Sequence, residues 1–144
     1  MTRRHRCSGD AGGLSLEMAI VAPLLIMALL LIAGFARVAA ANSTVDSAAY
    51  SAARAASISR SSGQATGDAQ AAAQQVLSQE GIKCPAKVVV DTSGFSTAPG
   101  ENASVRVNVD CPVALSDLAV PGLPGTVQIT SDASSVLDRY RGRE

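Results

Sequence analysis

The chain has 144 residues, a formal net charge of zero and a 47% share of hydrophobic residues, few of which are aromatic. This length allows one small domain in addition to a membrane anchor. The balanced charge gives no support for nucleic-acid binding, and the single histidine, His5, excludes a His-based catalytic triad or a His-ligated zinc site in the body of the protein. We therefore expect no enzyme, no cofactor or metal, and no small-molecule substrate.

Residues 1–12 form a short basic leader that contains Arg3, Arg4 and Arg6. Basic residues that precede an apolar segment remain on the cytoplasmic side of a membrane. The pattern therefore predicts a cytoplasmic leader at residues 1–12 and an extracytoplasmic C-terminal domain. It predicts a single-pass protein of the cell membrane.

An uncharged apolar segment runs from Met18 to Ala36. As a helix it would be about 28 Å long, which is close to the hydrocarbon thickness of a bilayer. We predict a transmembrane helix over residues 13–37. Pro23, in the second turn of this helix, leaves the carbonyl of Ala19 without its usual donor and predicts a slight kink.

A cleavable secretory signal is the alternative interpretation of the same segment. Ala39-Ala40-Ala41 matches an A-x-A cleavage site. In that case signal peptidase would cut after Ala41 and release a small secreted binding domain.

Glu17 borders the apolar segment. An ionisable residue at membrane depth is a candidate functional residue. A carboxylate near a helix N-terminus is also favoured by the helix dipole, without any further role. Position alone leaves both interpretations of Glu17 open.

Residues 38–62 continue the helical pattern without a proline or a glycine. Small residues recur at alternating spacings of three and four, which is typical of one helix face. We therefore predict a stalk helix over residues 38–62 that continues the membrane helix. Its stripe could pack against the protein's own sheet or against neighbouring subunits. The stripe comprises Val38, Ala41, Val45, Ala48, Ala52, Ala55 and Ser59.

Residues 63–144 are predicted to form a small exported α+β domain. Gly63 and Gly67 should interrupt the first helix. Thr66, between these two glycines, can cap a second helix. Gly81 is a natural end for that second helix.

Two segments of alternating residues follow the second helix. Cys84, Ala86, Val88 and Val90 share one face of the first, and Val105, Val107, Val109 and Cys111 share one face of the second. Between them, Ser93–Glu101 is predicted as a loop. An antiparallel register with Cys84 opposite Cys111 would align Val88 with Val107 and Val90 with Val105.

This register supports a hairpin with a Cys84–Cys111 disulfide, which requires an oxidising compartment. Two reduced, buried thiols are the alternative. After an irregular segment at Pro112–Gly125, Thr126–Ser131 is predicted as a third strand. The expected fold is α+β: a single long N-terminal transmembrane and stalk helix, a second helix, and a small antiparallel three-stranded sheet.

The segment Gly12-Gly13-Leu14-Ser15-Leu16-Glu17 resembles the processing site of type IV prepilins and pseudopilins. In those proteins a glycine precedes the cut, and a glutamate is the fifth mature residue. Residues Leu16–Leu25 resemble the V-E-F/M-A-(apolar)₃-P-(apolar)₂ pattern of TadE-like proteins, the minor pilins or pseudopilins of the bacterial tight-adherence pilus system. The alanine-rich segment through Arg54 and the ending Val136–Tyr140 are similar to those of the same family.

The resemblance implies a membrane-anchored pseudopilin that takes part in pilus assembly within a type IV pilin-like secretion system. Gly12 and Gly13 would flank the bond cut by a prepilin peptidase. Glu17 would neutralise the new ammonium group of Gly13, on a neighbouring subunit or its own. The implied partners are the bilayer, other pilins or pseudopilins, the pilus assembly platform and the prepilin peptidase.

Overall fold

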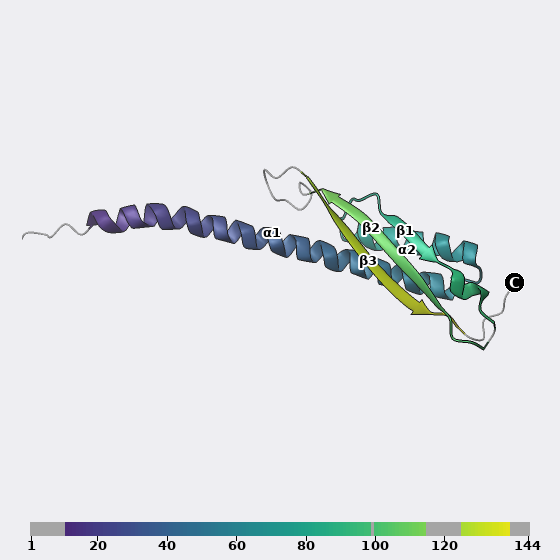
Figure 1. The fold of residues 1–144 in the computed structure, drawn as a ribbon. Coiled ribbons are helices and arrows are strands. Elements are labelled where there is room, and N and C mark those ends of the chain that lie inside the picture. The colour runs from purple at the N-terminus through teal and green to yellow at the C-terminus, as the bar shows by residue number, and fades with distance from the viewer. Residues whose placement is uncertain (1–10, 99, 115–124, 139–144) are drawn as a thin grey trace, which may run out of the picture. The chain divides into compact units, whose positions relative to one another are not determined.

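The computed structural model describes residues 11–98, 100–114 and 125–138, with side chains from Glu17 onward. In these residues a long apolar N-terminal helix is followed by a second helix and a three-stranded antiparallel sheet (Figure 1). This arrangement confirms the expected α+β fold. The elements in chain order are α1 (Ala11–Ile58), α2 (Ser62–Gln79), β1 (Lys87–Asp91), the 3₁₀ helix η1 (Ser93–Ser96), β2 (Ser104–Ala114) and β3 (Thr126–Val136).

The chain divides into two compact units, Met1–Phe35 and Ala36–Glu144. Helix α1 contributes residues to both units, because it extends from Ala11 to Ile58. In the first unit, the described residues are all part of α1. The second unit contains the rest of α1 and all the other elements.

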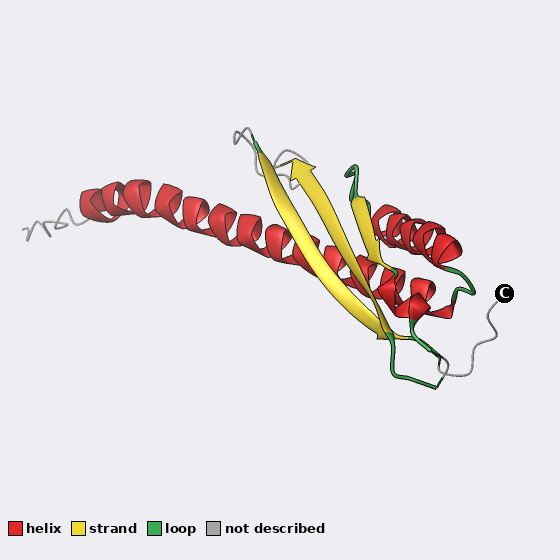
Figure 2. Cartoon of the chain, turned by 45° about the vertical axis from the view of Figure 1, so that its right-hand side comes forward, coloured by secondary structure: helices red, strands yellow, loops and turns green. Residues whose placement is uncertain are grey.

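The second unit has two layers. Its sheet has the strand order β1-β2-β3, and the part of α1 from Ala36 onward lies with α2 on one face of it (Figure 2). Strand β2 alternates along its whole length between buried residues and residues that are exposed or partly buried. Such alternation is expected of a strand with one face on the core and the other toward water.

The core of the second unit is built from small side chains on the helices and valines on the central strand. All of these residues belong to one cluster and are almost completely buried. The stripe on α1 therefore packs within its own unit, against the sheet and α2. The most buried members are Val45, Ala48, Ala49, Ala52, Ala53 and Ala56 on α1, Ala65, Ala69 and Ala73 on α2, and Val105, Val107, Val109 and Cys111 on β2.

Helix α1 ends at Ile58, four residues before the expected end of the stalk helix at residue 62. Serine hydroxyls bond to the backbone at this end. Ser57 Oγ donates to the carbonyl of Arg54 at 2.8 Å, and Ser59 Oγ lies 3.0 Å from the carbonyl of Ala55. Ser59 Oγ is also 2.7 Å from Asp68 Oδ2 of α2. Serines compete with helix continuation in this way, so the helix ends before the first glycine.

Helix α2 begins at Ser62, and the expected cap at Thr66 is wrong. Ser61 is the N-cap residue, and its side chain accepts a hydrogen bond from the backbone N–H of Gln64 at 3.3 Å. Gly63 and Gly67 are inside the helix rather than before it. A glycine costs only about 1 kcal/mol in a helix, and the burial of Ala65 offsets part of this cost.

The expected end of α2 at Gly81 is confirmed. Gly81 has a φ of 73°, a left-handed conformation that glycine adopts without steric cost. Its N–H donates to the carbonyl of Ser78 at 3.2 Å, and the N–H of Ile82 donates to the carbonyl of Leu77 at 2.9 Å. These two bonds form a Schellman motif, which satisfies carbonyl groups at the helix end.

The expected pairing register of β1 and β2 is wrong by two residues. Val88 pairs with Val109 and Val90 pairs with Val107. The expected register pairs Val88 with Val107 and Val90 with Val105. Side chains alternate between faces with a period of two, so a shift by two residues leaves every valine on the same face. The hydrophobic pattern therefore fixes the face but does not distinguish between these two registers.

The second and third strands are both longer than expected. Strand β3 extends from Thr126 to Val136 rather than ending at Ser131, and it pairs with β2 along its whole length. Pro112 lies within β2, opposite Gln128, rather than in the irregular segment. Strand β1 pairs with β2 only as far as Asp110, so Pro112 has no strand partner on the β1 side, where a missing N–H is tolerated. Residues 115–124 of the expected irregular segment are outside the described residues.

The expected loop after β1 contains the short helix η1. Asp91 Oδ1 accepts a hydrogen bond from the backbone N–H of Ser93 at 3.0 Å. This bond, with the Ser93 side chain and the charge of Arg106, lowers the pKa of Asp91. Arg106 is the strand partner of Asp91, so an exposed charge pair marks the point where β1 ends.

The close packing of α2 predicts that a larger side chain at Ala69 will destabilise the fold. Ala69 has no exposed surface, so Ala69→Leu should lower the free energy of unfolding by roughly 1–3 kcal/mol through overpacking. Ala71 is on the same helix but exposed, so Ala71→Leu is the matched control and should change stability little. Thermal unfolding of the full chain in detergent, followed by circular dichroism, measures both. Equal stabilities for the two variants would contradict the packing described here.

Candidate functional site

The candidate site begins with the backbone of residues 12–17. Gly12, Gly13 and Glu17 all lie in the first turns of α1, which begins at Ala11. Two consecutive glycines are poor helix formers, so the bond between Gly12 and Gly13 lies in an intrinsically weak helix turn. Glu17 follows about one helical turn after Gly13, because it is four positions further along the chain.

The apolar part of α1 is exposed throughout. Its large side chains retain between 40% and 75% of their accessible surface. By length and composition, α1 is the one helix of the described residues that is able to cross a membrane. A contiguous apolar surface of this size needs lipid or other apolar helices around it. The exposed side chains are Met18, Ile20, Val21, Leu24, Leu25, Ile26, Met27, Leu29, Leu30, Leu31, Ile32 and Phe35.

Glu17 is the only charged residue on this surface. Its side chain is exposed, and no described residue forms an ion pair with it. The next charged residue along α1 is Arg37. At membrane depth an unpaired carboxylate is costly, and the described part of the chain supplies no cationic partner for Glu17.

Pro23 is inside α1, and the helix continues on both sides of it. Proline lacks an N–H, so the carbonyl one turn before it, at Ala19, has no helical donor. The slight kink expected at this position stays a prediction.

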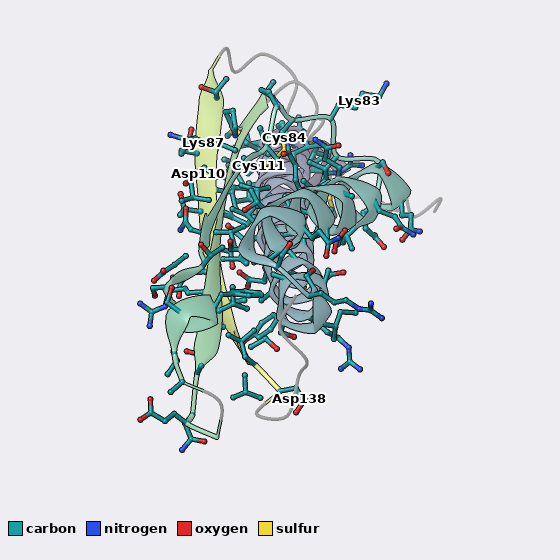
Figure 3. All side chains as sticks on the ribbon, turned by 90° about the vertical axis from the view of Figure 1, so that its right-hand side faces the viewer. Lys83, Cys84, Lys87, Asp110, Cys111 and Asp138 are labelled. Carbon is teal, nitrogen blue, oxygen red and sulfur yellow. A yellow bond between two sulfur atoms is a disulfide. The ribbon has the colours of Figure 1, made fainter. Side chains whose placement is uncertain are left out.

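Cys84 and Cys111 form a disulfide, with their Cα atoms 5.6 Å apart. Figure 3 shows both cysteines together at one end of the sheet. The correct register would place Ala86, not Cys84, opposite Cys111. A tight turn at Pro85 makes the bond possible, because the N–H of Ala86 donates to the carbonyl of Cys84 at 2.9 Å and folds the chain back toward Cys111.

The outer face of the sheet is polar. Lys87 of β1 pairs with Asp110 of β2, and both lie on the side of the sheet away from the helices (Figure 3). Thr130 of β3 donates a hydrogen bond to Asp110 Oδ1 at 2.6 Å. This row of three residues crosses the sheet and fits a solvated face, as alternation along the strands predicts.

The described residues contain no group of three or more His, Cys, Asp or Glu side chains that could hold a metal ion. Two serines form hydrogen bonds between α1 and β3. The partly buried Ser135 of β3 donates to the buried Ser57 of α1 at 3.0 Å, and Ser57 in turn donates to its own helix backbone. This chain of hydroxyls links the end of α1 to the sheet.

Sequence reasoning did not assign a role to the exposed face of α1 in the second unit. Tyr50 and Ile58 on that face are 66% and 79% exposed. Their spacing of eight residues, with Arg54 midway, was a visible signal of a shared helix face. The stripe of small residues on the buried side of α1 was the stronger sequence pattern, so the exposed residues were not considered further.

The described residues thus define a chain with one candidate membrane-spanning helix at its N-terminal side and a small, disulfide-linked α+β unit. Residues 12–54 match the TadE family model, whose description is TadE-like protein. The resemblance drawn from the motif around Glu17 is therefore confirmed over this segment. No curated protein and no solved structure matches the chain.

The disulfide predicts a measurable loss of stability when it is removed. Cys84→Ser with Cys111→Ser should lower the free energy of unfolding by about 3.5 kcal/mol in the chain-entropy model, for a sequence separation of 27. Cys7→Ser is the matched control and should have no effect. The pairing itself is read from electrophoretic mobility of the exported protein after thiol alkylation, with and without prior reduction. Identical mobilities would show that the two thiols are not linked.

Proposed function

We propose that the chain is a membrane-anchored TadE-like pseudopilin, or minor pilin, that takes part in the assembly of an adhesive tight-adherence pilus. The observation that carries this proposal is the coincidence of three features in one helix. The TadE-like match covers residues 12–54, the apolar surface of α1 is exposed from Met18 onward, and Glu17 is at its border. The role is structural rather than enzymatic.

In this proposal a prepilin peptidase cuts the bond between Gly12 and Gly13. The cut removes the basic leader and creates an ammonium group on Gly13, one helical turn before Glu17. In hydrocarbon, an unpaired ammonium and an unpaired carboxylate are each costly, whereas together they form an ion pair. Pairing between neighbouring subunits would fix their relative position during assembly.

The proposed topology has the leader, residues 1–12, in the cytoplasm and the transmembrane helix at residues 13–37. The stalk begins at residue 38, and residues 63–144 form the exported domain. Arg3, Arg4 and Arg6 support this orientation through the positive-inside rule. The Cys84–Cys111 disulfide supports it independently, because such bonds persist in oxidising compartments. The partners are the bilayer, other pilins or pseudopilins, the assembly platform and the peptidase.

The alternative, a secreted binding domain released after Ala41, is less well supported. Ala39-Ala40-Ala41 lies inside α1, and Ala41 is only 4% exposed. Ala41 belongs to the core of the second unit, so a cut directly after it would remove a core residue and leave a charged N-terminus beside the core. Cleavage there would also remove Val38, which packs against the same core.

The first prediction from this proposal concerns processing. Gly12→Ala should block cleavage, because a methyl group would occupy the recognition position before the cut, and the full-length precursor should accumulate. Immunoblotting of membrane fractions measures the ratio of precursor to mature protein. Gly63→Ala is the matched control: its added methyl group meets nothing within 4 Å, and processing should be normal. Unchanged maturation of Gly12→Ala would count against the prepilin interpretation.

The second prediction concerns Glu17. In Glu17→Ala the Gly13 ammonium loses its partner, at a cost of roughly 2.5–3.5 kcal/mol at membrane depth, which is on the order of a 100-fold loss in subunit association. Processing and export should be normal, whereas incorporation into sheared pili should be lost. Glu101→Ala removes an exposed carboxylate elsewhere and is the control. Normal piliation in Glu17→Ala would remove the assembly role from this residue.

A further inference from the structure

The two cysteines of the Cys84–Cys111 disulfide lie in different surroundings. Cys111 is in the central strand β2, has no exposed surface, and is paired with Ile129 of β3, which is 3% exposed. Cys84 is only partly buried, and it lies in residues 82–86, which are in neither a helix nor a strand. Of the two cysteines, only Cys84 therefore has surface in contact with solvent.

The backbone around Cys84 is held at both ends but not at the cysteine itself. Strand β1 begins to pair with β2 only at Lys87, and the N–H of Ile82 donates to the carbonyl of Leu77 at the end of α2. Within the described residues, no hydrogen bond joins Cys84 to β2. Cys84 can therefore move outward without breaking a hydrogen bond of the sheet, whereas Cys111 is fixed by the pairing of β2 with β3.

The charges next to Cys84 in the sequence are positive. Lys83 precedes it, Lys87 follows three residues later, and they are the only lysines of the chain. Both are exposed, and neither forms an ion pair with a described residue. Asp110 is the strand partner of Lys87 and opposes its charge, whereas the side chain of Lys83 extends away from the sheet (Figure 3). A net positive charge at this position attracts thiolates and other anionic reagents.

We propose that Cys84 is the site at which this disulfide exchanges with other thiols and disulfides, and that Cys111 is the second cysteine, which closes the bond. The ligand of the site is a disulfide in the oxidising direction and a thiol in the reducing direction. A small-molecule thiol or an oxidoreductase with a reactive cysteine pair can supply this chemistry. The proposal does not depend on the pilus role, because both cysteines belong to the second unit.

The oxidising direction consists of two exchange steps. The thiolate of Cys84 attacks one sulfur of the oxidant's disulfide, the S–S bond of the oxidant breaks, and its other sulfur leaves as a thiolate. The thiolate of Cys111 then attacks Sγ of Cys84, and the first sulfur of the oxidant leaves. In total, the two cysteines lose two electrons and two protons, and the oxidant's disulfide becomes two thiols. The Cα atoms of the two cysteines are 5.6 Å apart, which is within the range that a disulfide spans.

Mapping of an adduct on the native disulfide tests the site directly. The full chain with Cys7→Ser, folded in detergent with its disulfide intact, is exposed to reduced glutathione, quenched with acid and alkylated. Trypsin separates the two cysteines, because it cuts after Lys87 and Arg106. Glutathione should be found on Cys84, and the alkyl group on Cys111. Glutathione mainly on Cys111, or equally on both cysteines, would overturn the proposal.

Single-cysteine variants test whether the fold causes this selectivity. In a Cys7→Ser background, Cys111→Ser leaves Cys84 as the only thiol, and Cys84→Ser leaves Cys111. With oxidised glutathione, Cys84 should react faster by about tenfold or more, because Cys111 reacts only after local opening. In concentrated urea the two rates should become similar. Equal rates in buffer, for variants that retain the circular dichroism of the folded chain, would overturn the proposal. If the variants do not fold, the mapping on the native chain decides.

A charge reversal at Lys83 tests the electrostatic contribution. In the Cys111→Ser chain, Lys83→Glu should slow the reaction of Cys84 with oxidised glutathione, which is anionic, and accelerate the reaction with cystamine, which is cationic, each by about two- to fivefold. Arg106→Glu is the control and should leave both rates unchanged, because position 106 is five residues along β2 from position 111, about 17 Å. Equal changes with both reagents would overturn the role of the Lys83 charge.

The mass of the adduct in cells identifies the source of the ligand. The Cys111→Ser chain is recovered from acid-quenched cells, and its intact mass is measured before and after reduction. A small added mass identifies a small-molecule thiol, and a protein-sized added mass identifies an oxidoreductase; both support exchange at Cys84. Absence of an adduct, or an equal amount of adduct on the Cys84→Ser chain, would overturn it.

Discussion

The structure depends on one constraint: a helix surface without charge from Met18 to Ala36, exposed along its length, next to a single carboxylate. Water cannot solvate such a surface at an acceptable free energy, so lipid or other helices must cover it. Covering it with lipid brings Glu17 to the edge of the hydrocarbon, where it needs a cation. In the proposed function, anchoring, processing and assembly would all depend on this one short segment, and the ion pair with Gly13 would use its single charge.

The second unit meets a different constraint, which is the shortage of large apolar side chains. Alanines on α1 and α2 bury little area each, but they allow the helices to approach the valines of β2 closely. A core that buries so little apolar area is stabilised by a covalent link. The Cys84–Cys111 disulfide supplies such a link next to β1, the shortest of the described strands. Burial of Ala41 and Val45 also makes α1 part of this core.

Much of the fold could be predicted from the sequence because periodicity is a strong signal over long segments. The stripe on α1 and the alternating valines on β2 identified the buried faces correctly. Periodicity did not determine the pairing register of β1 and β2, since a shift of two residues leaves each side chain on the same face of the sheet. The turn at Pro85, which brings Cys84 next to Cys111, was not predicted either. The start of α2 was misplaced because two glycines suggested a break, whereas the Ser61 cap and the burial of Ala65 decided the helix start. Of the site, Glu17 was identified as a candidate by its position at the border of the apolar segment. Gly12, and the role expected of Glu17, came only from a family motif, because their chemistry depends on groups that the described residues do not contain.

The central claim is that α1 is an anchor cut at its N-terminal border rather than a signal removed at Ala41. The intact mass of the mature protein, purified from membranes under non-reducing conditions, tests this most directly. The account predicts a chain that begins at Gly13, retains the apolar segment, and contains one internal disulfide. A mature chain that begins at Asn42 would contradict it, because the anchor, Glu17 and the TadE-like motif would all be absent from the finished protein.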